Sequence, residues 1–137
     1  MFLKVDNNFV RQMKNHVMEF FYEPAIGCIL GTNGYIWIHS LRSEGQPITL
    51  VERTRMAALR NAIIALEKSK VPIFRDTIVK ALDSANNLGF EPKAMLIPAN
   101  VELICESAKE LVDDEISTQK QVNVQQLMKE MQKNDFN

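Results

Sequence analysis

The sequence predicts an α+β fold in which a three-stranded antiparallel sheet is backed by helices and followed by a C-terminal helical extension. Three observations lead to this fold class. Two apolar runs flank an Asn-Gly pair at 33–34, a pattern typical of a β-hairpin. Thr49 and Glu52 have the spacing of a helix capping box. Apolar residues then recur with helical period, in separate segments, as far as residue 116.

The composition fits one globular domain rather than two. Of the 137 residues, 46% are hydrophobic and 24% are charged, which is enough apolar material for a modest core. The 16 Lys and Arg residues oppose 17 Asp and Glu residues, so the formal net charge is -1. A chain with this balance has no overall basic field to attract nucleic acid. Any contact with RNA must therefore come from a local basic patch or from partner proteins.

The cysteines indicate a reducing compartment, and the hydropathy pattern predicts no membrane-spanning segment. Cys28 and Cys105 lie in apolar stretches without a Cys or His at ligand spacing, which favours buried free thiols over a disulfide or a zinc site. No apolar run approaches the roughly 20 residues that span a bilayer. The N-terminus also lacks the pattern of a secretory leader. We therefore expect a cytosolic or nuclear protein.

The first predicted elements are a strand and a short helix. Residues 2–5 have the character of the end of a strand. Asp6 or Asn7 can cap a helix after it. The apolar residues of this helix have helical spacing: Phe9, Val10, Met13 and Val17. A second helical turn is expected over 17–21, and Pro24 ends it.

A β-hairpin is the most strongly marked element. Its strands are expected at 25–30 and 35–40, joined by Thr32-Asn33-Gly34. Because both central residues of a tight primed turn need positive φ, Asn33 and Gly34 suit that turn. In the second strand aliphatic residues alternate with aromatic ones, so one face can meet helices while the other carries large aromatic side chains.

Three helices are expected after the hairpin. The first begins at the Thr49 capping box and is expected to be the longest. A second covers about 74–88 and is stopped by Gly89, which adopts the left-handed conformation readily. A third covers about 100–116. Its last acidic residues, Asp113-Asp114-Glu115, then lie at the end where the helix dipole disfavours them.

These elements divide the chain into three predicted parts. Residues 1–70 form the sheet and its first covering helix, residues 71–116 form the helical extension, and residues 117–137 form a polar tail. The tail is rich in Gln, Asn and Lys and has sparse apolar residues, which is typical of a frayed helix or a disordered segment.

Several motifs give the chain a resemblance to a known family. The hairpin segment Gly31-Thr32-Asn33-Gly34-Tyr35-Ile36-Trp37 is similar to the GxNG and Ile-Trp segment of RNA-exosome cap subunits. Residues 56–66 resemble the arginine–asparagine helix that follows it in those proteins. Residues 74–78 and the helix led by Pro98 also resemble their C-terminal part.

The similarity covers about residues 2–116 and implies a KH domain over residues 1–70. In that family an N-terminal domain and an OB-fold domain precede the KH domain. The resemblance therefore marks the chain as a C-terminal portion of a longer cap protein, or as an unusually short homologue.

The resemblance implies a non-catalytic RNA-binding subunit of the RNA exosome. Such a cap docks on a ring of RNase-PH-like subunits and guides RNA into three-prime to five-prime degradation or processing, including rRNA maturation. The implied partners are the ring subunits and RNA, without a cofactor or a metal. Abundant Asn, Gln and Met argue against a hyperthermophilic source and for a eukaryote. The implied locations are then the nucleus, with its nucleolus, and the cytoplasm.

The candidate RNA contacts are four basic residues, which the first helix and the hairpin loop are expected to bring to one end of the domain. They are Lys4, Arg11, Lys14 and Arg42. A typical KH domain instead grips about four nucleotides with a GXXG loop between its first two helices. That location falls near residues 14–16, where this sequence has no glycine.

Four residues of the family motif are predicted to be structural: Gly31, Asn33, Gly34 and Trp37. The glycines have GXXG spacing but lie between two strands, so they are expected to fix strand register and to pack against a neighbouring domain. The alternative is that the amides of the turn contact RNA. Trp37 is expected to pack against helices or a docked domain, with base stacking as the alternative.

No catalytic residue is predicted. His16 and His39 are the only histidines, and neither has an Asp, Cys or Ser at a recognisable catalytic or metal spacing. The acidic run 113–115 favours a solvated helix end over a Mg²⁺ site. Three classes of function remain: the exosome cap subunit, an autonomous KH module that binds single-stranded RNA, and an enzyme. An autonomous KH module requires a glycine-rich clamp, and an enzyme requires converging titratable groups.

Overall fold

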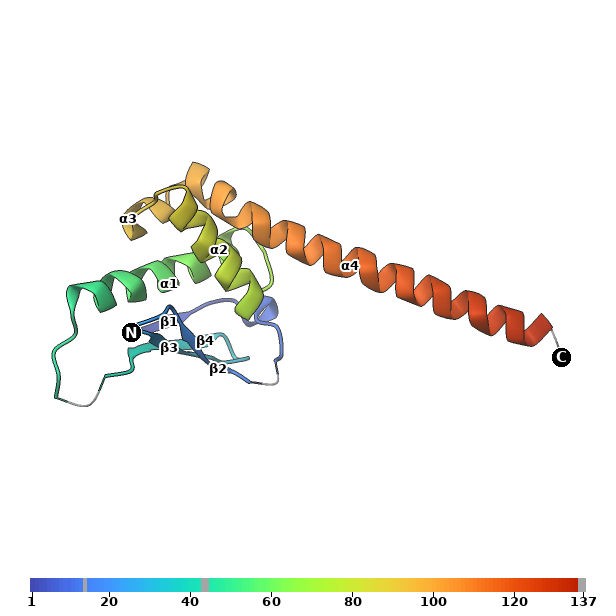
Figure 1. Ribbon diagram of the computed structural model, residues 1–137, viewed down its shortest axis with the longest axis horizontal. Coiled ribbons are helices and arrows are strands. Elements are labelled where there is room, and N and C mark those ends of the chain that lie inside the picture. Colours follow the sequence, from blue (N-terminus) through green and yellow to red (C-terminus); the bar gives the residue numbers. More distant parts are fainter. Residues whose placement is uncertain (14, 43–44, 136–137) are drawn as a thin grey trace.

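The computed structural model describes residues 1–13, 15–42 and 45–135. Over these residues, four strands form one antiparallel sheet and the helices lie on one side of it (Figure 1). The strands, in the spatial order β1-β4-β3-β2, are β1 (Phe2–Lys4), β2 (Val17–Phe20), β3 (Ile26–Leu30) and β4 (Tyr35–Ser40). The predicted α+β class, with helices packed against an antiparallel sheet, is confirmed.

The sheet has four strands and not three, because part of the segment predicted as helix is strand β2. One turn of 3-10 helix covers Asn7–Phe9, whereas Val17–Phe20 pairs with β3 along its whole length. Alternate residues of β2 are buried and exposed, which is the two-residue period of a strand. Pairing with a distant strand therefore overrides the local helical spacing.

The chain between the 3-10 turn and β2 is also extended. Val10 forms a parallel bridge with Ile73, in the connection between the first two long helices. The Ile73 amide donates to the Phe9 carbonyl at 2.6 Å, and the Arg11 amide donates to the Ile73 carbonyl at 3.1 Å. These hydrogen bonds hold the segment between β1 and β2 against the segment that joins the first two long helices.

The hydrophobic core lies between the inner face of the sheet and helix α1 (Leu50–Lys68). The two central strands contribute five fully buried side chains: Ile26, Cys28, Leu30, Ile36 and Ile38. Leu59, Ile63 and Leu66 of α1 cover them and are fully buried as well. Each such aliphatic side chain contributes roughly 1.5–3 kcal/mol by leaving water. This contact therefore stabilises the sheet against the helical layer.

Both cysteines are buried free thiols, as the sequence predicts. Burial raises the pKa of Cys28 to about 12. Burial also raises the pKa of Cys105, while a hydrogen bond with Ser69 and the charge of Lys109 act in the opposite direction. A protonated thiol is a poor nucleophile, so these residues act as small apolar side chains.

The start of α1 has the predicted capping box and an additional link to the sheet. The Thr49 hydroxyl accepts from the Glu52 amide at 3.2 Å, and the Glu52 carboxylate accepts from the Thr49 amide at 3.1 Å. Glu52 is fully buried. Its carboxylate also accepts from the Ser40 hydroxyl at the end of β4 and pairs with the Arg42 guanidinium. The helix cap therefore also anchors the chain that leaves β4.

The remaining helices are α2 (Arg75–Asn87), α3 (Pro92–Met95) and α4 (Pro98–Asp135). Helix α2 matches its prediction within one residue, and Gly89 follows it with a φ of 74°. Helix α3 is a short turn between the second and third predicted helices. Over the described residues α4, with 38 residues, is the longest helix, and α1, with 19, is not.

Helix α4 continues far beyond its predicted end at residue 116. Its first turns bury Val101, Ile104 and Ala108, in the part of α4 that lies along α2 (Figure 1). From residue 113 to 132 its side chains are exposed, and the helix projects away from the domain (Figure 1). Gln, Lys, Glu and Met are good helix formers, and this stretch has no Gly or Pro. The polar tail is therefore helical to residue 135, and the acidic run 113–115 lies in mid-helix.

Candidate nucleic-acid and protein interface

The face of the sheet turned away from the helices carries a row of exposed apolar side chains. In order across the sheet it consists of Phe2, Trp37, Ile29 and Val17, which the strand register pairs one with the next. Their exposed fractions are 68%, 37%, 41% and 61%. We call this set the apolar row. Each strand contributes one member, so the row crosses the whole sheet.

Strand alternation explains why these residues share one face. In β4 Ile36 and Ile38 are fully buried, and Trp37 between them must point outward. The Phe2 and Trp37 rings meet edge to face, with centroids 4.5 Å apart and planes inclined by 64°. Aromatic pairs in this arrangement gain about 0.5–1.5 kcal/mol beyond area burial. The two rings therefore hold each other in place on an open surface.

Lys4 and Tyr35 flank the apolar row on the side of the hairpin turn. They are paired in register between β1 and β4, and the Lys4 ammonium lies 5.2 Å from the centroid of the Tyr35 ring. On the other side of the row, Gly27 faces His39. A Cβ at Gly27 would lie 2.4 Å from the His39 ring, so the imidazole occupies space that a side chain would fill. We call the apolar row together with Lys4 and Tyr35 the outer sheet face.

The outer sheet face has two possible uses on physical grounds. Exposed aromatic rings can stack nucleic-acid bases, an interaction worth about 1–3 kcal/mol per base. A contiguous exposed apolar surface also marks contacts with other proteins. Two of the four members of the row are aliphatic, and the sheet supplies one basic side chain, Lys4, among its outward-facing residues. This composition favours a protein contact over a single-strand binding groove.

Both glycine amides of the Gly31–Gly34 turn donate within the hairpin. The Gly34 amide donates to the Gly31 carbonyl and the Gly31 amide donates to the Tyr35 carbonyl, both at 3.0 Å. The Asn33 side-chain oxygen accepts from the Tyr35 amide at 3.1 Å. Amides occupied in this way are not free to bind phosphate. The geometry is that of a turn that closes a hairpin.

One detail of the predicted turn is wrong. Gly34 has a φ of 87°, but Asn33 does not have a positive φ. The loop is therefore a three-residue connection with glycine at its left-handed position, and not a two-residue primed turn. A Cβ at Gly34 would lie 2.3 Å from the Val5 carbonyl oxygen. Glycine is required there by both the backbone conformation and the close approach of the chain after β1.

The predicted basic residues that the structure describes do not all lie at one end of the domain. Lys4 lies beside the start of β4, whereas Arg42 follows the end of that strand. The Arg11 guanidinium pairs with Glu115 of α4 at 2.9 Å and lies 3.9 Å from the centroid of the Phe74 ring. Arg42 pairs with the buried Glu52. Lys14 lies outside the described residues. Lys4 alone of these is part of the outer sheet face.

Both histidines make hydrogen bonds to the backbone. His16 Nδ1 lies 2.7 Å from the Leu30 carbonyl, and its Nε2 accepts from the Met13 amide at 3.4 Å. These bonds favour the tautomer with the proton on Nδ1. His39 Nδ1 lies 3.2 Å from the Ser40 carbonyl. Among residues 1–13, 15–42 and 45–135 no group of three or more His, Cys, Asp or Glu residues is placed to hold a metal ion.

Most of the outer sheet face cannot be predicted from the sequence. The positions of Phe2, Val17 and Ile29 in one row become visible only when the register of every strand is known. The available signal was the alternation in β4, which placed Trp37 outward.

No helix within the described part of the chain has the length and apolarity needed to cross a bilayer.

Comparison with known proteins supports the resemblance at two levels. A family model described as a KH domain matches residues 1–44. The exosome complex component RRP4 of Mus musculus is 27% identical over 127 residues, which covers 82% of this chain and 41% of that protein. RRP4 of Bos taurus is 25% identical with the same coverage. The chain thus spans less than half the length of the relatives it matches.

The matched KH segment, residues 1–44, contains all four strands of the sheet and the Gly31–Gly34 turn. The outer sheet face is therefore built entirely from the KH-like segment. The chain carries a KH domain match at its start and is, over most of its length, distantly similar to RRP4 exosome components.

Proposed function

We propose that this chain is an RRP4-like, non-catalytic, RNA-binding part of an exosome cap. In this proposal a KH domain over residues 1–70 and a helical extension over 71–116 dock on RNase-PH-like ring subunits. The cap guides RNA toward three-prime to five-prime processing or degradation, including rRNA maturation. Its places of action are the nucleus, with the nucleolus, and the cytoplasm.

The single observation that carries the proposal is the apolar row on a KH-like sheet. A row formed by Phe2, Trp37, Ile29 and Val17 spans all four strands and lies open. Soluble proteins seldom leave such a surface in water unless another molecule covers it. A subunit of a permanent assembly has a partner to cover it, and the similarity to RRP4 gives the kind of assembly.

RNA binding in this proposal is weak for the chain alone and depends on the assembly. The net charge is -1, and single-strand binders rely on positive charge along the backbone. Lys4 is the leading phosphate contact, because it lies beside the exposed ring of Tyr35 on the outer sheet face. Arg11, Lys14 and Arg42 remain proposed contacts. For Arg11 and Arg42, RNA phosphates would compete with the carboxylates of Glu115 and Glu52.

A pull-down with RNase-PH-like ring subunits, together with a titration of the isolated chain with single-stranded RNA at several salt concentrations, tests the proposal. We expect retention by the ring proteins and weak, salt-sensitive binding of RNA without sequence preference. Tight and sequence-selective RNA binding in the absence of ring proteins would instead identify an autonomous KH module and contradict the proposal.

A further inference from the structure

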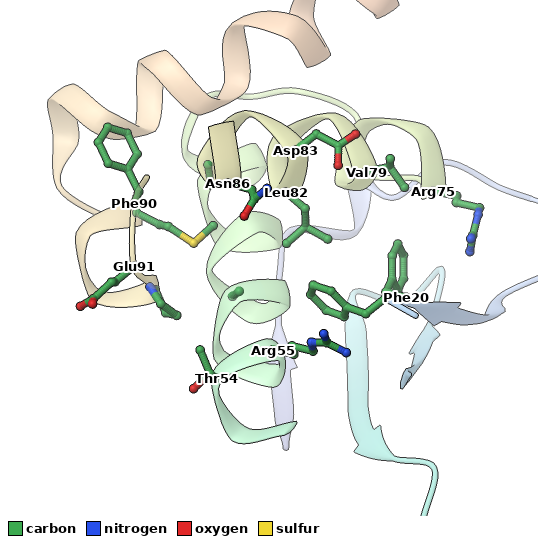
Figure 2. A pocket seen from close by; sticks show the side chains of 15 residues that line it. Phe20, Thr54, Arg55, Arg75, Val79, Leu82, Asp83, Asn86, Phe90 and Glu91 are labelled. Carbon is green, nitrogen blue, oxygen red and sulfur yellow. The ribbon is translucent and has the colours of Figure 1, made fainter. Parts of the chain in front are cut away.

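A cavity of about 540 Å³ lies on the helical side of the domain. It is bounded by the end of β2 and the residues after it, by α1 and α2, and by the α3 turn (Figure 2). This size lies within the range of ligand pockets in proteins, about 300–1,000 Å³. The helices lie on one side of the sheet (Figure 1), whereas the side chains of the outer sheet face point to the other side, so the two surfaces can be occupied at the same time.

The walls of the cavity are mostly apolar. They include Phe20, Phe21, Val79, Leu82, Phe90 and Met95. Four other lining residues, Arg75, Asp83, Asn86 and Glu91, are exposed, so the cavity opens to solvent along one side. An apolar recess with a polar rim can accept a large apolar side chain whose backbone stays near water.

Two arginines are held in fixed orientations at one end of the cavity. Arg55 Nη1 donates to the carbonyl oxygens of Tyr22 and Pro24, at 3.3 and 2.7 Å. Arg75 Nη1 donates to the Glu19 carbonyl at 3.0 Å. Both guanidinium groups therefore use Nη1 for backbone contacts, and of their five N–H donors three remain on Arg55 and four on Arg75. Within the described chain neither is paired with a carboxylate at 4.0 Å or less.

The aromatic rings beside these arginines fix the guanidinium groups further. The Arg55 guanidinium carbon lies 5.3 Å from the centroid of the Phe21 ring, and that of Arg75 lies 5.1 Å from the centroid of the Phe20 ring. Figure 2 shows both arginines at the same end of the cavity as Phe20, with Phe90 and Glu91 at the other end. The two guanidinium groups therefore lie at one end of the cavity, and the Glu91 carboxylate lies at the other.

The backbone that carries Phe21 is strained. Phe21 has a φ of 69° and Glu23 has a φ of 37°, a region that bulky residues seldom adopt. The two hydrogen bonds from Arg55 stabilise this conformation and keep the Phe21 ring on the cavity wall. Strained backbone of this kind concentrates at ligand clamps and functional sites.

We propose that this cavity binds a short peptide segment of a partner protein, in which a large apolar side chain lies next to a carboxylate. The apolar side chain fills the recess between Leu82, Phe90 and Met95. The carboxylate accepts from the free N–H groups of Arg55 and Arg75, because guanidinium groups bind carboxylates with paired, charge-assisted hydrogen bonds. The peptide backbone pairs with the polar rim, where Asn86 offers both a donor and an acceptor.

The charge of the lining disfavours nucleic acid as the occupant. Arg55 and Arg75 are balanced by Asp83 and Glu91, so the cavity has no net positive charge. A polyanion would meet two carboxylates for every two guanidinium groups, whereas nucleic-acid sites are strongly basic. A fatty acid would satisfy the arginines and the apolar wall but would make no hydrogen bonds with the amide of Asn86 on the polar rim. A peptide satisfies the apolar wall, the basic end and the rim together.

A displayed random-peptide library panned on the full chain tests the proposal with one pair of variants. Asn86→Trp places a large ring at the cavity mouth, and Asn87→Trp makes the same change at the next exposed position of α2, outside the lining. We expect enriched peptides to share a large apolar residue next to Asp or Glu. Their synthetic consensus should bind the Asn87→Trp variant normally and the Asn86→Trp variant at least about tenfold more weakly. Equal binding to both variants would overturn the proposal.

A charge exchange tests the basic end separately. Arg75→Glu should weaken the acidic consensus peptide by about tenfold, and replacing the acid of the peptide with Lys should restore binding to that variant. Lys80→Glu, at an exposed position of α2 outside the lining, is the matched control and should change the affinity for neither peptide. Thermal melting of each variant shows that it is folded. A consensus without an acidic residue, or displacement of the peptide by oligouridine, would also overturn the proposal.

Discussion

Phe2 and Trp37 lie side by side on the open face of the sheet, one on the first strand and one on the last strand of the sequence, with ring centroids 4.5 Å apart. This contact joins two segments that are 35 positions apart in the chain, and it forms although neither ring is buried. It continues through Ile29 and Val17 to the far edge of the sheet. The KH-like segment therefore presents an apolar surface on which two aromatic rings already hold each other in place.

Gly34→Val should reduce the free energy of unfolding by about 3 kcal/mol or more, because it adds a clash to a strained backbone. Gly34 has a φ of 87°, and a Cβ there would lie 2.3 Å from the Val5 carbonyl oxygen. Gly89→Val is the matched control, because Gly89 has a φ of 74° and open space around it. It should cost about 1–2 kcal/mol for the backbone conformation alone. Urea denaturation measures both values.

A Gly34 variant that kept the full unfolding free energy but lost RNA affinity would give the turn a direct role in RNA binding. The hydrogen bonds within the turn predict the opposite, a stability loss without a separate binding loss.

The domain should become less stable as the pH falls below about 4.5, because the stabilising contribution of the Glu52 carboxylate is then lost. The hydrogen bond from the Ser40 hydroxyl is the largest cause that lowers the pKa of this carboxyl, followed by bonds from Thr49 and the charge of Arg42, and together they outweigh the effect of burial. The pKa falls from 4.5 to about 2. Because the pKa is lower in the folded state, the carboxylate stabilises the fold above the unfolded pKa, and this contribution is lost as the pH falls toward 2.

The measurement is the unfolding free energy of the wild-type chain and of Glu52→Gln between pH 2 and pH 7. The variant should be less stable than wild type at neutral pH, and the difference should shrink as the pH falls through the range between 4.5 and about 2. Glu106→Gln, at an exposed position of α4, is the control. A difference that stayed constant over this range would show that the charge of Glu52 does not stabilise the fold.

The secondary structure could be predicted where local signals and tertiary contacts agree. The Asn33-Gly34 hairpin and the Thr49 capping box are such cases, since turn chemistry and capping act over a few residues. Strand β2 could not be predicted, because Val17 suits a helical stripe and a strand equally, and pairing with Ile29 across the sheet decides between them. The length of α4 was missed because an exposed polar helix has little apolar periodicity.

The candidate sites were harder to predict than the fold. The apolar row depends on the register of all four strands, and the cavity is lined by Arg55 of α1, Arg75 of α2 and Phe20 of β2, which come together only in the folded chain. The ion pairs of Arg11 and Arg42 also form only in the folded chain. The sequence shows two basic residues, whereas the structure pairs them with Glu115 and Glu52.

Ending the chain after Ile116 should leave the midpoint of thermal unfolding nearly unchanged. Side chains from 117 to 132 are exposed, and the helix there projects into solvent (Figure 1). Such a segment contributes local helix but little burial. Circular dichroism should show a smaller helical signal with the same melting midpoint. A clear fall in the midpoint would mean that this part of α4 packs against the domain in solution.

Lys4→Ala should weaken RNA binding by the assembled cap in a salt-dependent way. Each phosphate contact with single-stranded nucleic acid contributes about -0.7 to the slope of log affinity against log salt concentration. Loss of Lys4 should reduce the magnitude of that slope by about this amount. Fluorescence anisotropy with a labelled oligonucleotide measures the slope, and Lys109→Ala, an exposed lysine of α4, is the control. Equal slopes for the two variants would remove Lys4 from the proposed RNA contacts.

The most direct test of the account is the affinity of the chain for RNase-PH-like ring subunits after Ile29→Lys, measured by calorimetry beside RNA binding. Ile29 lies at the centre of the apolar row and is 41% exposed, whereas Val124 is 53% exposed and lies in the projecting part of α4, outside the proposed docking parts. We expect Ile29→Lys to weaken ring binding by at least about tenfold without weakening RNA binding by the isolated chain, while Val124→Lys changes neither by more than about twofold. Ring binding unchanged by Ile29→Lys, in a variant with normal thermal stability, would contradict it.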